Sequence, residues 1–285
     1  MDPGELELRP LDAEPSEPDL RPRASSARIV AIVLIAAAAI AAYVVFFWGR
    51  PASVIGPVAR GPAGVAAPVE APTALGGTPE PYDVPPLDQS DTFVRQMFEQ
   101  ISHHPTVLAW LATRNLIRTF TVSVLNIADG ASPAPHLAAL HPSARFTVVQ
   151  RDGAAYIDPG TYDRYTVLAD GVRSIDVQAA ARVYATLKPR INEAYRDLGY
   201  PGQSFDGVLQ RAIVALLDTP TIDGPIRLRP KGGTGYRYDD ERLEQLTAAQ
   251  KQLLRMGPQN ARLVKEALRS VGIALGINPR ALSVK

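Results

Sequence analysis

The chain has 285 residues, with 30 Lys and Arg residues against 29 Asp and Glu residues, and it contains no cysteine. The lack of cysteine excludes a disulfide framework, a thiolate metal site and a cysteine nucleophile. A formal net charge of +1 is not typical of a dedicated nucleic-acid-binding protein. No segment carries a recognisable catalytic signature, so the sequence predicts no catalytic residue, no metal site and no cofactor.

An uncharged apolar segment covers residues 29–48. At about 1.5 Å per residue it spans roughly 30 Å, which is the hydrocarbon thickness of a bilayer. Trp48, at its end, suits the headgroup region. The segment is too long for the apolar region of a cleavable signal peptide, and a tail precedes it. The sequence therefore predicts an uncleaved transmembrane helix at 29–48, after a disordered cytoplasmic tail at 1–28.

The residues that flank the predicted span indicate its orientation. Three arginines within residues 21–28 precede it and two within residues 50–60 follow it, which favours an N-terminus in the cytoplasm. Residues 49–87 are rich in Pro, Gly and Ala and predict a disordered, partly extended linker. In a bacterium the protein would then be a single-pass inner-membrane protein with its C-terminal domain in the periplasm.

Helical periodicity begins after residue 87. Three short helices are predicted between residues 90 and 128, the second of them beginning with Pro105. A β-hairpin is predicted over residues 146–158, because two short runs rich in β-branched residues flank the tight-turn pair Asp152 and Gly153.

Two further helices are predicted to begin at Asp158 and Asp176, whose carboxylates suit the N-cap position. Pro189 is expected to kink or split the second of them. An apolar helix then precedes a second hairpin over residues 222–238, and the last two helices meet at Gly257.

The predicted fold class is therefore α+β and mostly helical. A single C-terminal domain with two short β-hairpins would occupy residues 88–275, preceded by one transmembrane helix and a Pro-rich linker. Residues 276–285 are predicted to form a disordered tail.

Several stretches of the chain resemble a bacterial family, domain of unknown function 3014. The resemblance covers roughly residues 84–275 and includes the segments PPLDQSDTFVRQ, AAYIDPGTYDRY, LKPRINEAYRDLGYP and LLRMGPQNARLVKEALR. It implies membrane anchoring and a single domain, and it implies no activity and no role for any residue.

Positive charge is concentrated at the end of the chain, where residues 222–285 contain twelve basic and six acidic residues. The basic residues of the last two predicted helices share one face, opposite an apolar arc. This predicted basic face, which could attract phosphate-bearing lipid or another anionic envelope partner, consists of Lys251, Arg255, Arg262, Lys265 and Arg269. The pattern also fits a solvated face on a packed helical hairpin.

The segment Met256–Val264 is similar to the second half of a helix-hairpin-helix DNA-binding motif, in which backbone donors at a helix start meet a phosphate. The first glycine of that turn is absent, and a periplasmic domain would not meet chromosomal DNA. Nucleic acid is therefore not the expected partner.

Other chemistry-bearing residues fit simpler roles. The spacing of the four histidines, His103, His104, His136 and His141, matches no metal-ligand pattern, and His104 precedes a helical proline. Two acidic sets could serve a wall-acting hydrolase, Asp158 with Asp163 and the run Asp239–Glu241, but Asp158 and Asp240 also suit helix N-termini. The tyrosines could line a groove for a glycan or a peptide or lie at the edge of the core.

The expected function is a binding or scaffolding module in the bacterial envelope, because the chain combines a long tether and a basic face with no coherent catalytic set. Its expected partner is an envelope protein or an anionic lipid or glycan. Two alternatives stay open: an envelope (cell-wall) hydrolase, and a cytoplasm-facing DNA tether that would require the inverted topology.

Overall fold

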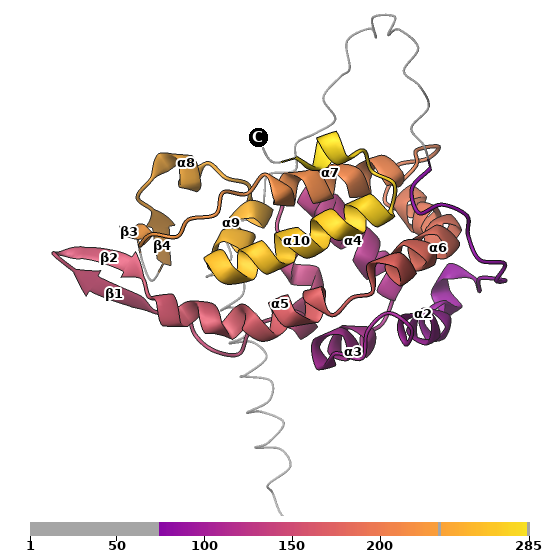
Figure 1. The fold of residues 1–285 in the computed structure, drawn as a ribbon, viewed down its shortest axis with the longest axis horizontal. Helices are drawn as coiled ribbons and strands as arrows, with labels where there is room; N and C mark the ends of the chain where they lie inside the picture. The colour runs from indigo at the N-terminus through magenta and orange to yellow at the C-terminus, as the bar shows by residue number, and fades with distance from the viewer. Residues whose placement is uncertain (1–73, 233–234, 284–285) are drawn as a thin grey trace, which may run out of the picture. The chain divides into compact units, whose positions relative to one another are not determined.

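The computed structural model describes residues 74–232 and 235–283 (Figure 1). The predicted tail at 1–28, the predicted span at 29–48 and the first part of the predicted linker lie outside these residues. The helices are α2 (Asp91–Phe98), α3 (Pro105–Leu111), α4 (Leu116–Ala128), α5 (Thr166–Arg173), α6 (Val177–Asp197), α7 (Asp206–Leu217), α8 (Glu241–Glu244), α9 (Ala248–Leu254) and α10 (Pro258–Ala274). The strands are β1 (Val148–Arg151), β2 (Ala154–Ile157), β3 (Arg227–Lys231) and β4 (Gly235–Tyr238).

Helices α3, α6, α8 and α9 begin where a local side chain satisfies a free backbone donor of the first turn. Asp176 accepts from the backbone N–H of Ala179 at 2.8 Å at the start of α6. Thr247 and Gln250 form a complete capping box at the start of α9. The expected break at Pro189 does not occur, because α6 continues through it as one helix and Pro189 is exposed.

The helical region, α2 to α7 with α10, holds the larger hydrophobic core. In Figure 1, α10 crosses in front of α4, and contacts join α10 to α5, α6 and α7 while α4 packs against α6 and α7. Phe205, Leu116 and Leu217 are almost completely buried at these contacts. The core therefore forms between helices that are distant in the sequence.

The four strands form one antiparallel sheet in the order β1-β2-β3-β4. Both predicted hairpins form, as β1 with β2 and β3 with β4. The sequence did not predict that they join into one sheet, in which β2 pairs with β3, with Ala155 opposite Leu228 and Tyr156 opposite Arg227. Burial explains the join, because Ala155 and Leu228 belong to a second hydrophobic core together with Tyr238. A two-stranded hairpin alone is marginally stable in water, whereas four strands share one buried face.

The predicted fold class also placed a transmembrane helix before the domain. No helix within residues 74–232 and 235–283 is long and apolar enough to cross a membrane. The predicted span lies outside these residues. The fold class is corrected to a helical region that packs beside a single four-stranded antiparallel sheet.

Residues 74–86, called the strap from here on, contact α6 and α7, although they belong to the predicted linker. Leu75 is buried, and its backbone N–H donates to Oδ2 of Asp206 at 3.1 Å. The Lys188 ammonium donates both to the carbonyl oxygen of Leu75 and to Oδ2 of Asp206. The strap is thus held by an ion pair between α6 and α7.

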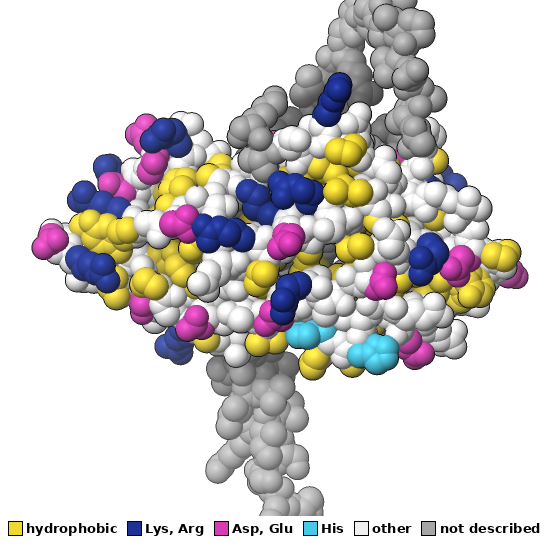
Figure 2. Space-filling model, viewed as in Figure 1, with side chains coloured by type: hydrophobic (Ala, Val, Ile, Leu, Met, Phe, Trp, Pro, Cys, Tyr) yellow, Lys and Arg dark blue, Asp and Glu magenta, His cyan; other side chains and the backbone are white. Residues whose placement is uncertain are grey.

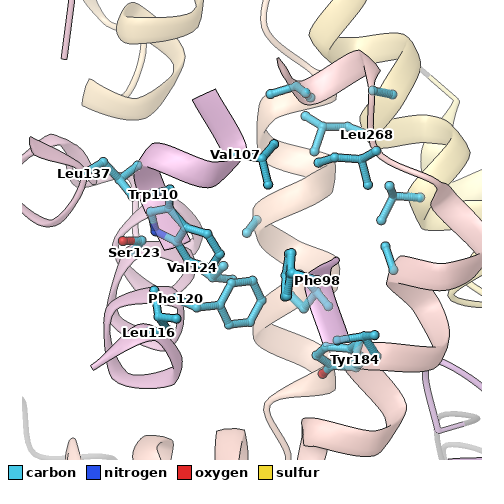
Figure 3. A pocket seen from close by; sticks show the side chains of 18 of the residues that line it. Phe98, Val107, Trp110, Leu116, Phe120, Ser123, Val124, Leu137, Tyr184 and Leu268 are labelled. Atoms are coloured by element: carbon cyan, nitrogen blue, oxygen red, sulfur yellow. The ribbon is translucent and has the colours of Figure 1, made fainter. Parts of the chain in front are cut away.

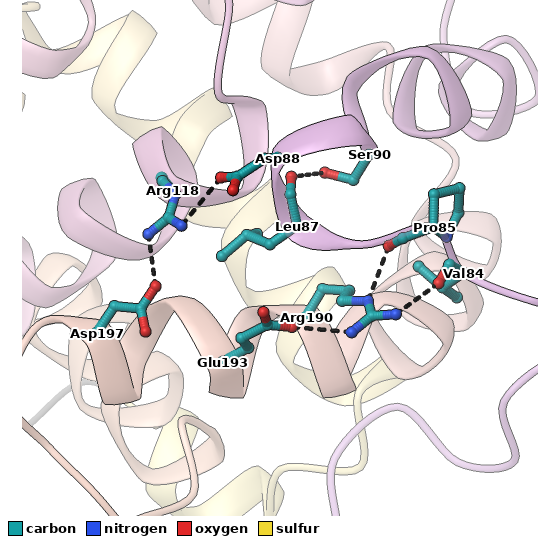
Figure 4. Close-up of polar contacts among 9 residues, drawn as sticks. All are labelled: Val84, Pro85, Leu87, Asp88, Ser90, Arg118, Arg190, Glu193 and Asp197. Carbon is teal, nitrogen blue, oxygen red and sulfur yellow. Dashed lines mark hydrogen bonds and ion pairs between the residues drawn. The ribbon is translucent and has the colours of Figure 1, made fainter.

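The end of the strap is fixed by a second set of polar contacts (Figure 4). Arg190 donates to the carbonyl oxygens of Val84 and Pro85 at 2.9 and 2.8 Å. Arg118 on α4 then bridges Asp88 at 3.1 Å and Asp197 at 2.7 Å. The ordered domain therefore begins before residue 88.

The C-terminal boundary also differs from the predicted residue 275. A short 3-10 helix, Pro279–Leu282, follows α10, and the Leu282 side chain is buried against Gly272. Glycine at position 272 leaves room for Leu282, because a Cβ on any other residue there would lie 2.9 Å from a Leu282 methyl group. Part of the predicted C-terminal tail thus belongs to the core.

Candidate functional site

The helical region contains a partly open cavity of about 420 Å³ (Figure 3). Helices α2 to α7 and α10 all contribute side chains to its wall. The volume falls within the range of about 300–1,000 Å³ that is usual for small-molecule sites. The cavity is therefore the candidate functional site.

Contacts between neighbouring helices set the positions of α3 and α4, which form one wall of the cavity. The Asp91 carboxylate on α2 accepts from the backbone N–H groups of Asn115 and Leu116 at 2.8 and 2.9 Å, at the start of α4. Arg95, one turn later on α2, donates to two carbonyl oxygens at the end of α3, at 2.7 and 2.8 Å. One helix thus orients both of the others through charged hydrogen bonds.

The lining of the cavity is apolar. It contains aromatic and aliphatic side chains, such as Phe98, Phe120 and Leu268, and no Asp, Glu, His, Lys or Arg side chain among the described residues. Tyr184 is the ionisable residue of the wall, and its hydroxyl donates to Oδ1 of Asp206 at 2.6 Å. Burial, together with this contact to Asp206, raises the pKa of Tyr184, so that its side chain stays neutral.

Two buried polar atoms of the wall have no hydrogen-bond partner in the described part of the chain. They are the indole nitrogen of Trp110 on α3 and the hydroxyl oxygen of Ser123 on α4. An unpaired buried polar group costs about 1–3 kcal/mol, and such groups are rare in folded proteins. These two atoms therefore require an explanation.

The predicted basic face is largely engaged in contacts within the chain. Lys251 pairs with Glu244 at 3.1 Å, and Arg262 pairs with Asp223. The Lys265 ammonium donates to the carbonyl oxygen of Thr219 at 2.7 Å. These three basic residues therefore make contacts that stabilise the fold itself.

The pKa of Lys265 is lowered by burial and then by the charge of Arg269. Arg255 lies near Tyr238, and burial raises the pKa of Tyr238 to about 12 although the charge of Arg255 opposes the rise. Figure 2 shows Lys and Arg side chains gathered over the region where α10 lies in Figure 1, with Asp and Glu side chains beside them. The role of the five residues in binding stays a prediction.

The simpler roles of several other candidates are confirmed. Asp158 and Asp240 cap helices, since they accept from the backbone N–H groups of Gly160 and Arg242 at 3.0 and 2.9 Å. His104 caps α3 through its Nδ1, which accepts from Thr106 at 3.2 Å. Within residues 74–232 and 235–283, no group of three or more His, Asp or Glu side chains is placed to hold a metal ion.

The tyrosines do not share one surface. Tyr184 lines the cavity, whereas Tyr195 and Tyr200 stack on each other with ring centroids 4.6 Å apart. Tyr162 packs against Gly257, where a Cβ would lie 2.4 Å from the ring. Gly257 has a φ of +82°, so the turn before α10 requires glycine for both its backbone and its neighbour.

Sequence patterns did not reveal the cavity or its two polar atoms. Ser123 occupies a buried position of α4, a weak signal because Ser in such a position usually bonds to a backbone carbonyl oxygen. Only the packing of helices distant in the sequence leaves both atoms without partners.

Comparison with known proteins places the chain in a family. The model of a family described as protein of unknown function (DUF3014) matches residues 116–272, from the first residue of α4 into α10. No curated protein and no solved structure gives a significant match to the chain. The matched residues amount to more than half of the chain and confirm the resemblance seen in the sequence. The chain therefore belongs to the family of proteins of unknown function DUF3014.

Proposed function

We propose that residues 74–283 form a binding module whose ligand is a small apolar molecule held in the cavity of the helical region. The observation that carries the proposal is the cavity itself, about 420 Å³ in volume with a wall of apolar side chains. Protein interiors are normally close-packed, with few voids larger than a water molecule. A cavity of this size is therefore a feature to be explained by use.

The energetic argument supports a bound ligand. The apolar side chains of the wall lack partner atoms across the cavity, so they lose dispersion contacts. A ligand that fills the cavity restores the lost dispersion contacts and stabilises the folded state in proportion to its concentration.

Binding is favoured over catalysis by the chemistry of the wall. Ser123 is the hydroxyl in the cavity with no partner, and among the described residues no base contacts it to activate it as a nucleophile. The Tyr184 hydroxyl is committed to Asp206. The wall thus offers apolar surface and shape, which are the properties of a carrier or sensor of an apolar molecule.

The proposal is tested with the full chain and the fluorescent hydrocarbon diphenylhexatriene. Wild type is expected to bind the probe with a saturable increase in fluorescence. Added undecane is expected to displace the probe and reverse this increase. Val124→Phe places a ring in the cavity and should weaken probe binding at least tenfold. The matched control is Val122→Phe on the same helix, which is not part of the cavity wall.

The two variants separate binding in the cavity from binding elsewhere. If Val122→Phe and Val124→Phe bind the probe as wild type does, the probe lies outside the cavity and the proposal fails. If wild type shows no saturable binding, it fails as well. Thermal unfolding of each variant shows whether a lost signal reflects a lost fold.

The envelope location of this module stays a prediction, because it depends on residues 29–48, outside the described part of the chain. A C-terminal alkaline-phosphatase fusion tests it, since the enzyme is active only after export. An active fusion is expected. An inactive fusion with normal expression would instead agree with the predicted alternative of a cytoplasm-facing protein.

A further inference from the structure

The two unpaired polar atoms belong to residues of the cavity wall that lie on separate helices, at one side of the cavity. Figure 3 shows the indole nitrogen of Trp110 and the hydroxyl of Ser123 on the same side of the cavity, together with Leu137. Ser123 is only 5% exposed, and its hydroxyl has no partner in the described chain. An edge contact with Phe98, with ring centroids 5.6 Å apart, holds the Trp110 ring in place.

The neighbouring hydroxyl of the same helix shows that the unpaired state of Ser123 is not forced by the helix. Thr121 is also fully buried, and its hydroxyl donates to the carbonyl oxygen of Ile117 at 2.8 Å, one turn earlier. This is the usual partner of a buried hydroxyl in a helix. Thr121 does not line the cavity, whereas Ser123 does. Of these two hydroxyls, the one without a partner therefore belongs to a residue of the cavity wall.

From these two unpaired polar atoms we infer that the ligand is a neutral hydrocarbon chain bearing a carbonyl oxygen, as in an ester or a ketone. This inference rests on the proposed function. The indole N–H of Trp110 can only donate, and the Ser123 hydroxyl can donate as well. A carbonyl oxygen has two lone pairs and accepts from both. The bare hydrocarbon fills the cavity but leaves both donors unpaired.

The absence of charge in the wall sets the neutrality of the ligand. No Lys, Arg or His side chain among the described residues lines the cavity, so a carboxylate would be buried without a counter-ion. The ionised form of a fatty acid is therefore disfavoured relative to its ester. The carbonyl end lies at Trp110 and Ser123, and the chain extends through the apolar remainder, whose wall includes Leu268 of α10.

Three competitors of similar length test the inference by displacement of diphenylhexatriene from the full chain: methyl decanoate, undecane and decanoate. On wild type, methyl decanoate is expected to bind about tenfold more tightly than undecane, and decanoate at about pH 8 is expected to bind most weakly. Ser123→Ala and Trp110→Phe should each reduce the affinity for the ester about fivefold and leave the affinity for undecane unchanged. The matched control, Thr121→Val, should keep the preference of wild type for the ester.

The possible results distinguish this inference from the proposed function. If undecane displaces the probe as well as the ester does, or if both Ser123→Ala and Trp110→Phe keep the preference for the ester, the inference is overturned while the apolar site stands. If decanoate binds as tightly as the ester, the neutrality of the ligand is overturned. If no competitor displaces the probe and the probe itself does not bind, the proposed function has failed.

Discussion

Two parts of the helical region contain buried polar groups that differ in their hydrogen bonding. Where the strap meets α6 and α7, Asp206 accepts from Tyr184, Lys188 and the backbone of Leu75. In the cavity, the polar atoms of Trp110 and Ser123 accept from and donate to no described group. Polar groups that hold the chain together are paired within it, and the comparison indicates that those of the cavity are paired from outside.

Tyr184 belongs to both regions. Its ring lines the cavity, and its hydroxyl joins the contact that holds the strap. It thus marks the boundary between polar groups with structural partners and polar groups without them. Substitutions of paired and of unpaired polar groups should therefore change the free energy of unfolding by different amounts and in opposite directions.

The largest loss in the free energy of unfolding is expected for Asp206→Ala, which removes the shared partner of the strap, Tyr184 and Lys188. Lys188 would keep a largely buried ammonium, with 18% of its side chain exposed, and lose its carboxylate partner. Breaking such a pair from one side costs about 3–5 kcal/mol, which should appear in urea denaturation. Asp218→Ala, at the exposed end of the same helix, should change the free energy of unfolding by less than about 0.5 kcal/mol. Equal stability of the two variants would contradict the comparison.

The next effect concerns Tyr184 at alkaline pH. Burial and the Asp206 contact raise its pKa, so the unfolded chain releases this proton near pH 10 while the native state retains it. Stability is therefore present below about pH 10 and is lost above it, by about 1.4 kcal/mol per pH unit. Denaturation curves at about pH 9, 10 and 11 should show a steeper loss for wild type than for Tyr184→Phe. Parallel losses would show that Tyr184 is not shielded.

A pair of hydroxyl variants in α4 tests the comparison most directly. Thr121→Val removes a buried hydroxyl that has a partner and should lower the free energy of unfolding by about 1 kcal/mol. Ser123→Ala removes one without a partner and should leave stability unchanged or raise it by up to about 1 kcal/mol, in the absence of added ligand. Opposite signs are expected in chemical denaturation. A destabilised Ser123→Ala would mean that the hydroxyl has a structural partner after all.

The smallest effect is expected for the exposed ion pairs near the end of the strap. Arg118 bridges Asp88 and Asp197, but 40% of its side chain is exposed to solvent. Arg118→Ala should cost no more than about 0.5 kcal/mol, and the cost should shrink further at high salt. Denaturation at low and high ionic strength measures both. A loss as large as that of Asp206→Ala would show that burial does not decide the strength of these contacts.

Local chemistry determined much of the secondary structure from sequence alone. The caps at Asp158 and Asp176 act within their own first turn, so their sequence patterns were sufficient. The hairpin turn at Asp152 and Gly153 is equally local, and both residues have positive φ. Each of these features depends on residues at most three positions apart.

The joining of the hairpins depended on tertiary structure. Ala155 pairs with Leu228 across more than seventy residues, and only their shared burial with Tyr238 decides that β2 and β3 are neighbours. The start of the domain depended on tertiary structure as well. The composition of the strap is typical of a linker, and only the contacts of Leu75 with Lys188 and Asp206 make it part of the domain. Sequence periodicity contains no information on such pairings.

The candidate site was decided by tertiary structure in full. The sequence predicted the short helices that carry Trp110 and Ser123, because local periodicity indicates where a helix forms. Whether an inward polar atom finds a partner depends on the side chains of other helices, and a cavity is a property of how several helices fail to fill one space. Short-range interactions form the helices, whereas long-range packing decides what lies between them.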